Sequence, residues 1–298
     1  MPTAGKGTYR ELLRQGEHLL RRRVHPAPCD DAATDAFLLL EKVSGLNRTN
    51  YPLKKDERYP QAEREEYLAL LRRRAAGEPV QYILGEWDFM GRDFTVGPGV
   101  LIPRPDTDQL TEAAIDYLRK RPECRVLELC GGSGCIAITV AKTLPAANVT
   151  VLELSPEAME YLRANMARHK ADNVTAVQGD ALCPPPTIQG PYDAILSNPP
   201  YIASGELPTL QREVRREPAM ALDGGTDGLD FYRSVCRLWR DVLHTGSRLA
   251  FEVGIGQADD VLRLMRGEGF GELEILPDPA GIPRVVTGLR YQEVYADA

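Results

Sequence analysis

The chain has 298 residues, of which 43% are hydrophobic and 27% charged, and it carries a net charge of −7 with a pI near 5.3. This composition is typical of a soluble globular protein with room for two domains. The acidity argues against a protein that grips a nucleic-acid backbone unaided, and no apolar run is long enough to span a bilayer.

The cysteines and the N-terminus indicate a cytoplasmic protein. The N-terminus lacks the apolar core of a secretory signal, and Glu11 and Glu17 weaken a transit-peptide interpretation. The cysteines form neither a CxxC pair nor the spacing of zinc ligands, so we expect reduced thiols and no metal site. They are Cys29, Cys124, Cys130, Cys135, Cys183 and Cys236.

Residues 8–76 have the leucine spacing of helices. The second of three predicted helices begins after Asp30 or Asp31, either of which supplies a capping side chain. The third begins near Pro60 and ends at Gly77. Each of the first and third helices ends in three arginines, which are either solvated helix ends or a surface for an RNA-bearing partner.

Residues 86–96 change to the aromatic pattern of a β-hairpin, with its turn at Met90-Gly91-Arg92. The segment 97–108 contains three prolines and cannot be helical. We take the hairpin and this segment as the hinge between two domains. The predicted parts are an N-terminal helical bundle over residues 1–84, a hairpin and proline-rich linker over 85–105, and a second domain over 106–298.

From residue 125 onward the hydrophobic pattern alternates between strand and helix, which is typical of an α/β fold with a parallel sheet wrapped by helices. In such sheets the ligand lies at the carboxyl ends of the strands. The predicted strands cover 125–129, 149–154, 174–178, 194–197, 248–253, 273–276 and 284–289. The predicted helices cover 135–144, about 229–243 and 259–265, with a further one beginning at Pro156.

A glycine-rich loop, residues 130–134, follows the first of these strands. Its glycines stand where a backbone turns tightly and approaches a ligand. Glu153 ends the second strand, where an acid accepts hydrogen bonds from ribose hydroxyls in dinucleotide enzymes and methyltransferases alike. Asp180, after the third strand, is placed either to receive an adenine amine or as a simple loop aspartate. The loop does not match the GxGxxG motif in full. On its own, however, it does not exclude a dehydrogenase.

The fourth strand ends in Asn198-Pro199-Pro200-Tyr201. The prolines have no N–H, fix φ, and aim the carbonyls of Asn198 and Pro199 in set directions. Asn198 adds an amide oxygen that accepts a hydrogen bond, and Tyr201 adds a flat aromatic face. This acceptor motif suits a planar group that bears an NH2, either a carboxamide or the exocyclic amine of a base.

The acceptor motif resembles the catalytic motif of amino-methyltransferases, which methylate nitrogen with S-adenosylmethionine and include adenine-N6 and glutamine-N5 enzymes. It is foreign to dehydrogenases, and alone it does not choose between the two methyltransferase types. Further stretches resemble one family, the protein-glutamine N5-methyltransferases that modify peptide chain release factors. They cover residues 77–87, 100–105, 197–202, 213–215, 227–233 and 281–286.

The resemblance implies a seven-stranded, class I (Rossmann-like) methyltransferase domain, a small helical bundle that binds release factors, and a hairpin linker. It implies S-adenosyl-L-methionine as cofactor and the glutamine of the Gly-Gly-Gln tip of class 1 release factors as substrate. The cofactor-binding residues expected are Glu128, Cys130, Gly131, Gly132, Ser133, Gly134, Glu153, Asp180, Ala181 and Asn198.

Three positions depart from the family pattern. The family usually has glycine at the position of Cys130, threonine at the position of Gly131 and aspartate at the position of Glu153. The Cys130 side chain is expected to face the cofactor and weaken its binding, unless a negative φ at this residue absorbs the change. Glu153 is a longer acid with the same role.

A glutamine amide is a poor nucleophile because its nitrogen lone pair is delocalised. We therefore expect catalysis by positioning and electrostatics. The Asn198 side-chain oxygen and the Pro199 carbonyl accept the two amide hydrogens, and Tyr201 packs on the carboxamide plane. The expected catalytic residues are Asn198, Pro199 and Tyr201, joined in substrate binding by Pro200 and Leu101; the alternative for Leu101 is core packing.

Two rival interpretations stay open from the sequence. An adenine-N6 methyltransferase would bind a flipped base in the acceptor motif. A catalytically silent protein would only bind release factors or ribosomes. The preferred interpretation expects a monomer that reads no nucleic acid directly and has no membrane contact.

Overall fold

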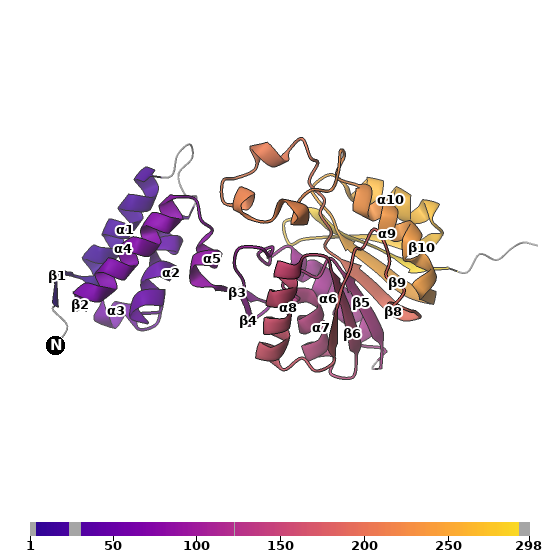
Figure 1. The fold of residues 1–298 in the computed structure, drawn as a ribbon, viewed down its shortest axis with the longest axis horizontal. Helices are drawn as coiled ribbons and strands as arrows, with labels where there is room; N and C mark the ends of the chain where they lie inside the picture. Colours follow the sequence, from indigo (N-terminus) through magenta and orange to yellow (C-terminus); the bar gives the residue numbers. More distant parts are fainter. Residues whose placement is uncertain (1–3, 24–30, 122, 292–298) are drawn as a thin grey trace, which may run out of the picture. The chain divides into compact units, whose positions relative to one another are not determined.

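The computed structural model describes residues 4–23, 31–121 and 123–291, which fall into two compact units (Figure 1). The first unit comprises Met1–Glu86 and Gln211–Arg216, and the second comprises Trp87–Leu210 and Glu217–Ala298. Asp30, one of the two predicted caps, lies outside the described residues.

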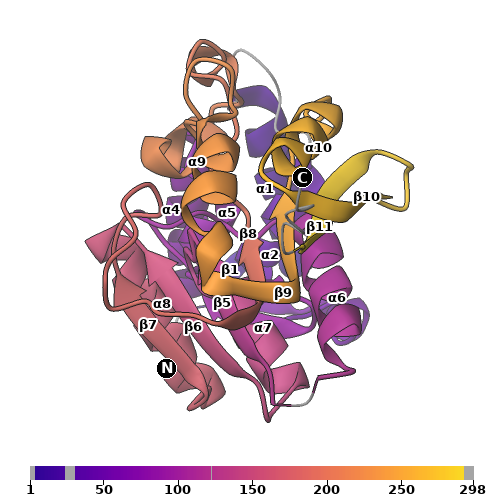
Figure 2. The ribbon, with the colours of Figure 1, turned by 90° about the vertical axis from the view of Figure 1, so that its right-hand side faces the viewer.

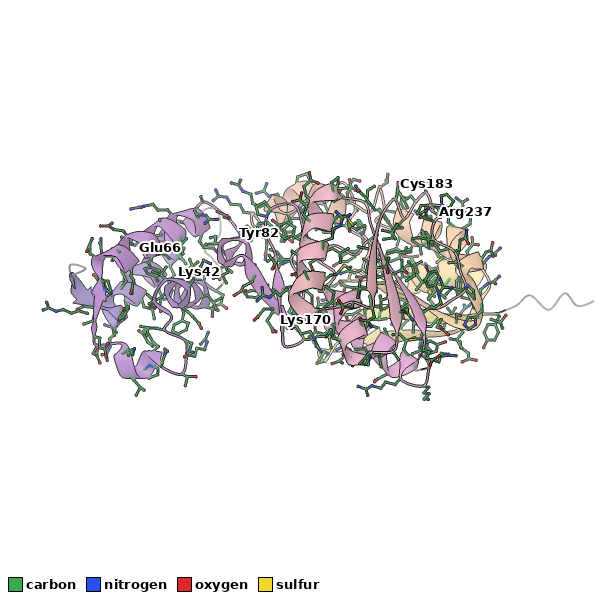
Figure 3. The ribbon with its side chains drawn as sticks, turned by 60° about the horizontal axis from the view of Figure 1, so that its bottom comes forward. Lys42, Glu66, Tyr82, Lys170, Cys183 and Arg237 are labelled. Carbon is green, nitrogen blue, oxygen red and sulfur yellow. The ribbon has the colours of Figure 1, made fainter. Side chains whose placement is uncertain are left out.

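The first unit is a helical bundle, as the leucine spacing predicted. Its helices are α1 (Tyr9–Arg23), α2 (Ala32–Ser44), α3 (Tyr51–Lys54), α4 (Gln61–Ala75) and α5 (Val80–Leu84). The Asp31 side chain caps α2 by accepting from the Thr34 amide at 3.2 Å. Lys42, labelled on α2 in Figure 3, donates from Nζ to the Leu84 carbonyl at the end of α5, at 2.9 Å.

Two short strands in this unit were not predicted. Strand β1 (Ala4–Thr8) pairs antiparallel with β2 (Arg58–Pro60). The β1 sequence, Ala-Gly-Lys-Gly-Thr, has no apolar alternation from which a strand can be predicted. Strand β2 lies in the turn-rich segment that separates the second and third predicted helices, where no strand was expected.

The second unit is built on one seven-stranded sheet in the order β10-β11-β9-β8-β5-β6-β7. Strands β7, β6, β5, β8 and β9 run parallel, and β11 and β10 are antiparallel to their neighbours. The bounds are β5 (Arg125–Leu129), β6 (Asn148–Glu153), β7 (Val174–Gln178), β8 (Tyr192–Ser197), β9 (Leu243–Glu252), β10 (Phe270–Pro277) and β11 (Pro283–Arg290).

Helices cover both faces of this sheet (Figure 2). One face packs on α6 (Thr107–Leu118), α7 (Cys135–Thr143) and α8 (Pro156–His169), and the other on α9 (Asp230–Leu238) and α10 (Ala258–Gly267). Alternate strand residues serve the two cores, with Val126 on one face and Leu127 on the other. The doubly covered parallel sheet confirms the predicted class I methyltransferase architecture.

Two further predictions concern the hairpin and the region around β9. The hairpin is present as β3 (Glu86–Phe89) and β4 (Arg92–Thr95). The helix predicted over about 229–243 is too long, because α9 ends at Leu238 and a short 3-10 helix, η4 (Arg240–Val242), follows it.

In the described part of the chain, no helix has the length and apolar character needed to cross a membrane.

Candidate active site

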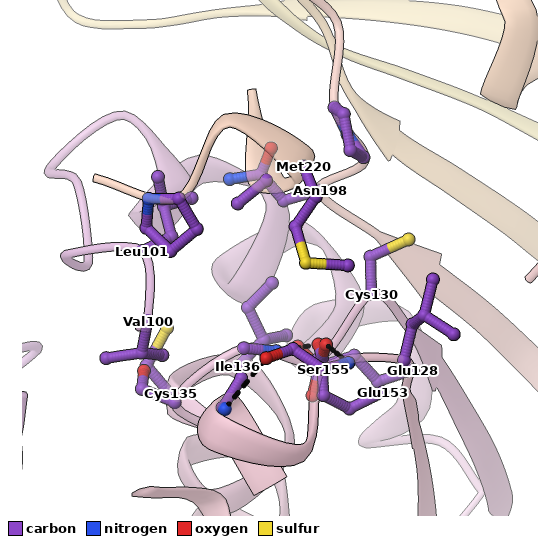
Figure 4. A pocket seen from close by; sticks show the side chains of 18 of the residues that line it. Val100, Leu101, Glu128, Cys130, Cys135, Ile136, Glu153, Ser155, Asn198 and Met220 are labelled. Carbon is purple, nitrogen blue, oxygen red and sulfur yellow. Dashed lines mark hydrogen bonds between the residues drawn. The ribbon is translucent and has the colours of Figure 1, made fainter. Parts of the chain in front are cut away.

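A pocket lies at the carboxyl ends of the parallel strands, with about 890 Å³ of empty space when its open mouth is included (Figure 4). Its lining comes from the proline-rich segment, the glycine loop after β5, the ends of β6 and β7, the motif after β8, and a loop near residues 218–221. All of these segments belong to the second unit.

The glycine loop is held against strand β6. The Gly131 amide donates to the Leu152 carbonyl at 3.1 Å, and the Gly134 amide donates to the Gly131 carbonyl at 2.8 Å. A Cβ on Gly131 would lie 2.1 Å from Val151 Cγ1, so the threonine usual in the family does not fit this backbone. Gly134 precedes α7 with φ +78°, a left-handed conformation that favours glycine.

Cys130 also has a left-handed backbone, with φ +61°. A negative φ, the condition under which we expected its side chain to be absorbed, is therefore absent. The side chain lines the pocket and packs against the core beneath it. Burial raises the pKa of the thiol well above its ordinary value, and a hydrogen bond with Ser197 only partly opposes this, so Cys130 is a neutral thiol.

Glu153 connects two loops at the floor of the pocket. Its Oε2 accepts from the Gly132 amide at 2.8 Å, and its Oε1 accepts from the Ser155 amide at 2.7 Å (Figure 4). Each carboxylate oxygen retains a lone pair for a further donor. Glu153 therefore both fixes the glycine loop and presents acceptors suited to ribose hydroxyls.

Glu128 is a second buried carboxyl group in the pocket. Burial raises its pKa to about 8, opposed by a hydrogen bond from the Ala137 amide and reinforced by the charge of Glu153. The Ala137 amide lies in the first turn of α7, 2.9 Å from Glu128 Oε2. Glu128 is therefore mostly protonated at neutral pH and attaches the strand to the start of the helix.

Asp180 and Ala181 line the pocket beyond the end of β7. Asp180 Oδ1 accepts from the Leu182 amide at 2.8 Å, which fixes the carboxylate orientation. The carbonyl of Ala181 accepts from the buried Trp239 indole at 2.7 Å. The predicted adenine-side residues thus stand on a rigid loop in the same pocket as Glu153.

The acceptor motif faces the pocket through Asn198 and Pro200, whereas Pro199 and Tyr201 are not part of the lining. Figure 4 shows Asn198 beside Met220, across the pocket from Glu153 and Ser155. Asn198 Nδ2 donates to Thr107 Oγ1 at 3.2 Å, and Thr107 Oγ1 donates to Glu252 Oε2 at 2.6 Å. Leu101 lines the same pocket, and the catalytic roles assigned to the motif stay predictions.

The Tyr201 ring packs beside Gly254, where an added Cβ would lie 3.0 Å from Tyr201 Cδ2. Its backbone carbonyl accepts from Gln257 Nε2 at 2.9 Å. Burial raises the pKa of Tyr201 to about 12, with the charge of Glu252 adding to the effect. Tyr201 is therefore a neutral phenol at the base of the acceptor motif.

Sequence reasoning missed Thr107 and Glu252, which are both 2% exposed. Glu252 is the last residue of β9, and Thr107 is the first of α6. The one available signal was that Glu252 is a carboxyl group at the end of a predicted apolar strand. The sequence gives no indication that Thr107 lies beside it.

Two family descriptions match the chain: the PrmC N-terminal domain over residues 11–85 and the methyltransferase small domain over residues 93–225. The chain is 43% identical to the release factor glutamine methyltransferase of Geobacter sulfurreducens over 261 residues, 87% of this chain and 90% of that protein. It is 40% identical to the protein of the same name from Gloeobacter violaceus over 272 residues, 90% of this chain and 93% of that protein.

A solved methyltransferase from Pyrococcus furiosus has the same fold, with a TM-score of 0.51 at 18% identity over 68% of this chain and 91% of that one. At this identity the likeness concerns the fold alone.

Proposed function

Because the chain belongs to the release factor glutamine methyltransferases, we propose that it methylates the side-chain amide nitrogen (N5) of the glutamine in the Gly-Gly-Gln motif of class 1 peptide chain release factors. The methyl donor is S-adenosyl-L-methionine. The family membership supports this reaction over the adenine-N6 and silent-protein interpretations.

The residues of the pocket fit the cofactor. The Glu153 oxygens suit the two ribose hydroxyls, and Asp180 suits the adenine amine. The apolar side chains of Val100 and Ile136 line the wall beside them. When bound, the cofactor supplies an electrophilic methyl group on a sulfonium sulfur.

The acceptor motif holds the glutamine amide. The Asn198 oxygen and the Pro199 carbonyl accept its two hydrogens, so its nitrogen is kept in one orientation and the positive charge that develops there is stabilised. Tyr201 is assigned to one face of the carboxamide and Leu101 to the other. The methylated amide then loses one proton, which leaves the product neutral.

One observation carries the proposal: Asn198, the glycine loop and Glu153 line a single pocket. A nitrogen held by the acceptor motif and a methyl donor held by the glycine loop therefore share one cavity. This arrangement supports direct transfer between them.

The test incubates the chain with tritiated S-adenosylmethionine and a class 1 release factor, followed by peptide mass spectrometry. The expected result is a gain of one methylene unit on the Gly-Gly-Gln glutamine. DNA and RNA are offered in parallel and should take up no label. Label on adenine, or none on the release factor, would overturn the proposal.

The Asn198→Ala variant separates catalysis from cofactor binding. Turnover should fall by at least about 100-fold, as for the loss of a charge-stabilising group at other active sites, while the cofactor Kd by calorimetry stays within a few-fold. Loss of cofactor binding would favour the cofactor-binding role that the resemblance also implies for Asn198 and would contradict its assignment to the substrate amide.

The proposal includes a cytoplasmic monomer, since release factors act there during translation. The protein is also expected not to bind nucleic acid directly and not to contact a membrane. Light scattering of the purified chain with and without a release factor tests the monomer, and a dimeric mass for the free chain would contradict it.

A further inference from the structure

We propose that Glu252 is a positioning residue: through Thr107, it decides which end of the Asn198 side chain faces the substrate amide. The inference rests on the proposed function, because it takes Asn198 as the acceptor of a glutamine N–H. Glu252 itself is not among the residues that line the pocket.

Three separate elements converge to make this relay. Glu252 ends β9, Thr107 begins α6, and Asn198 directly follows β8. The Thr107 hydroxyl lies 2.6 Å from Glu252 Oε2 and 3.2 Å from Asn198 Nδ2. Glu252 and Thr107 are both 2% exposed, so water has little access to the bond between them, whereas Asn198 is half-buried at the pocket wall.

The direction of the relay follows from the chemistry of its three groups. An ionised carboxylate only accepts hydrogen bonds, and a hydroxyl has one hydrogen to donate. Thr107 therefore donates its hydroxyl hydrogen to Glu252, and its lone pairs accept from the Asn198 NH2 group. The Asn198 oxygen is left on the opposite side of the amide and accepts from the substrate.

The reverse orientation of Asn198 would place its NH2 group against the substrate NH2 group. Two donors cannot form a hydrogen bond, and neither would stabilise positive charge on the substrate nitrogen. A neutral carboxyl at Glu252 permits this orientation, because it donates a hydrogen itself and releases the Thr107 hydrogen toward the Asn198 oxygen. The relay is thus polarised only while Glu252 is ionised.

The surroundings place the ionisation of Glu252 near neutral pH. Burial raises its pKa to about 7. The Thr107 hydrogen bond lowers the pKa, the charge of Asp106 raises it, and the charge of Arg284 and a side-chain hydrogen bond with Asn198 lower it. The other titratable groups that face it are Tyr201, Tyr232 and Cys135. Turnover should therefore rise with pH through this range.

The experiment measures kcat, KM for a release factor and cofactor Kd from about pH 5.5 to 8.5 for wild type, Glu252→Gln, Thr107→Val and Thr107→Ser. We expect wild-type kcat to rise with a midpoint near pH 7. Glu252→Gln and Thr107→Val should lower kcat at least tenfold and flatten its pH profile, with KM and Kd changed less than threefold. Thr107→Ser keeps the hydroxyl and should retain the wild-type profile.

The double variant Glu252→Gln/Thr107→Val should be no worse than the poorer single variant, because both residues act through one relay. Thr287→Val is the matched control: Thr287 is a buried threonine whose hydroxyl donates to the Leu249 carbonyl at 3.1 Å, outside the pocket. It should lower Tm without changing the pH profile of kcat. If Glu252→Gln fails to fold, the pH profiles of kcat for Thr107→Val and Thr107→Ser test the inference in its place.

Retention of the wild-type kcat and pH profile in both Glu252→Gln and Thr107→Val would overturn the inference while leaving the proposed function intact. Failure of wild type to methylate a release factor would overturn the function instead. An independent readout is the Asn198 side-chain amide resonance in NMR, which should titrate near pH 7 in wild type and not in Glu252→Gln. An amide resonance that does not titrate in wild type overturns the relay regardless of activity.

Discussion

Cys130 shows how one residue can occupy a glycine position at a cost. At φ +61°, any side chain brings Cβ close to the following carbonyl, which costs roughly 1–2 kcal/mol relative to glycine. The side chain recovers part of this by packing against the core. The contribution of the left-handed backbone to the free energy of unfolding can be isolated by comparing two variants that both lack the thiol.

We predict that Cys130→Gly is more stable than Cys130→Ala by about 1 kcal/mol. This order is the reverse of that in ordinary helices and strands, where alanine is the more stable. Chemical denaturation of both variants gives the difference in the free energy of unfolding. An alanine variant as stable as the glycine variant would contradict a left-handed Cys130.

Glu128 makes the stability of the fold depend on pH. Its folded pKa of about 8 lies above the ordinary value of 4.5, so its stabilising contribution is complete below pH 4.5 and is lost as pH rises through 8. We predict that Glu128→Gln gains stability relative to wild type as pH increases from about 5 to 9. A constant difference in the free energy of unfolding over this range would contradict the burial of an ionisable group.

The residues of the site were predictable where they adjoin in sequence or follow a predicted strand, as Glu153 and Asp180 do. Asn198 and Tyr201 share one short motif, and the glycine loop was visible because its residues are consecutive. Thr107 lies 91 residues before Asn198, and its role depends on the packing of α6 against the sheet. A polar relay assembled from three elements has no local sequence pattern.

Among the elements, helices and buried parallel strands were predicted well because their hydrophobic periods are clear. Strand β9 begins five residues earlier than predicted, at Leu243 rather than 248. Its early part is His244-Thr245-Gly246, with φ +81° at Gly246, and the register with β8 shifts between Tyr192 and Ala194. Such an irregular, polar start resembles a turn in sequence, and only pairing with β8 makes it a strand.

The junction of β5, β6 and their following helices depends on Glu153. A glutamine has one acceptor oxygen in place of two, so Glu153→Gln cannot accept from both the Gly132 and Ser155 amides. We predict at least tenfold weaker cofactor binding by calorimetry, in line with the loss of about 1.5 kcal/mol or more for a charged hydrogen bond.

Glu157→Gln is the control for this prediction, because Glu157 is exposed in the first turn of α8 and does not line the pocket. Its cofactor Kd should match wild type within about twofold. Equal weakening in both variants would indicate a general effect of negative charge near α8 rather than the bridge at Glu153.

At the scale of the whole molecule, the chain is not divided at a single point. It leaves the second unit after Leu210, contributes Gln211–Arg216 to the first unit, and returns at Glu217. Within the first unit, Arg74 bonds to Asp35 at 2.5 Å and to Glu213 at 2.7 Å. A boundary chosen from sequence alone missed this segment, because its recruitment depends on a buried arginine 139 residues away.

The Arg74 cluster gives the strongest stability prediction. Removing one partner of a buried ion pair leaves the others uncompensated, so Arg74→Met should destabilise the first unit by about 3–5 kcal/mol. Arg73→Met is the matched control: Arg73 pairs with Glu78 from a side chain 47% exposed, and its loss should cost less than about 1 kcal/mol. Hydrogen exchange should speed up in α2, α4 and residues 211–216 for Arg74→Met alone.

The same cluster sets the acid sensitivity of the first unit. Burial raises the pKa of Glu213, but the Arg74 hydrogen bond and other contacts lower it by more than burial raises it. The net pKa of Glu213 therefore lies below the ordinary value of 4.5. Its stabilising contribution is therefore present above that pH and is lost as pH falls. Arg74→Met should weaken this acid-dependent loss in a denaturation series below about pH 5, whereas Arg73→Met should retain it. Equal acid sensitivity of wild type and Arg74→Met would show that residues 211–216 are held by contacts other than this cluster.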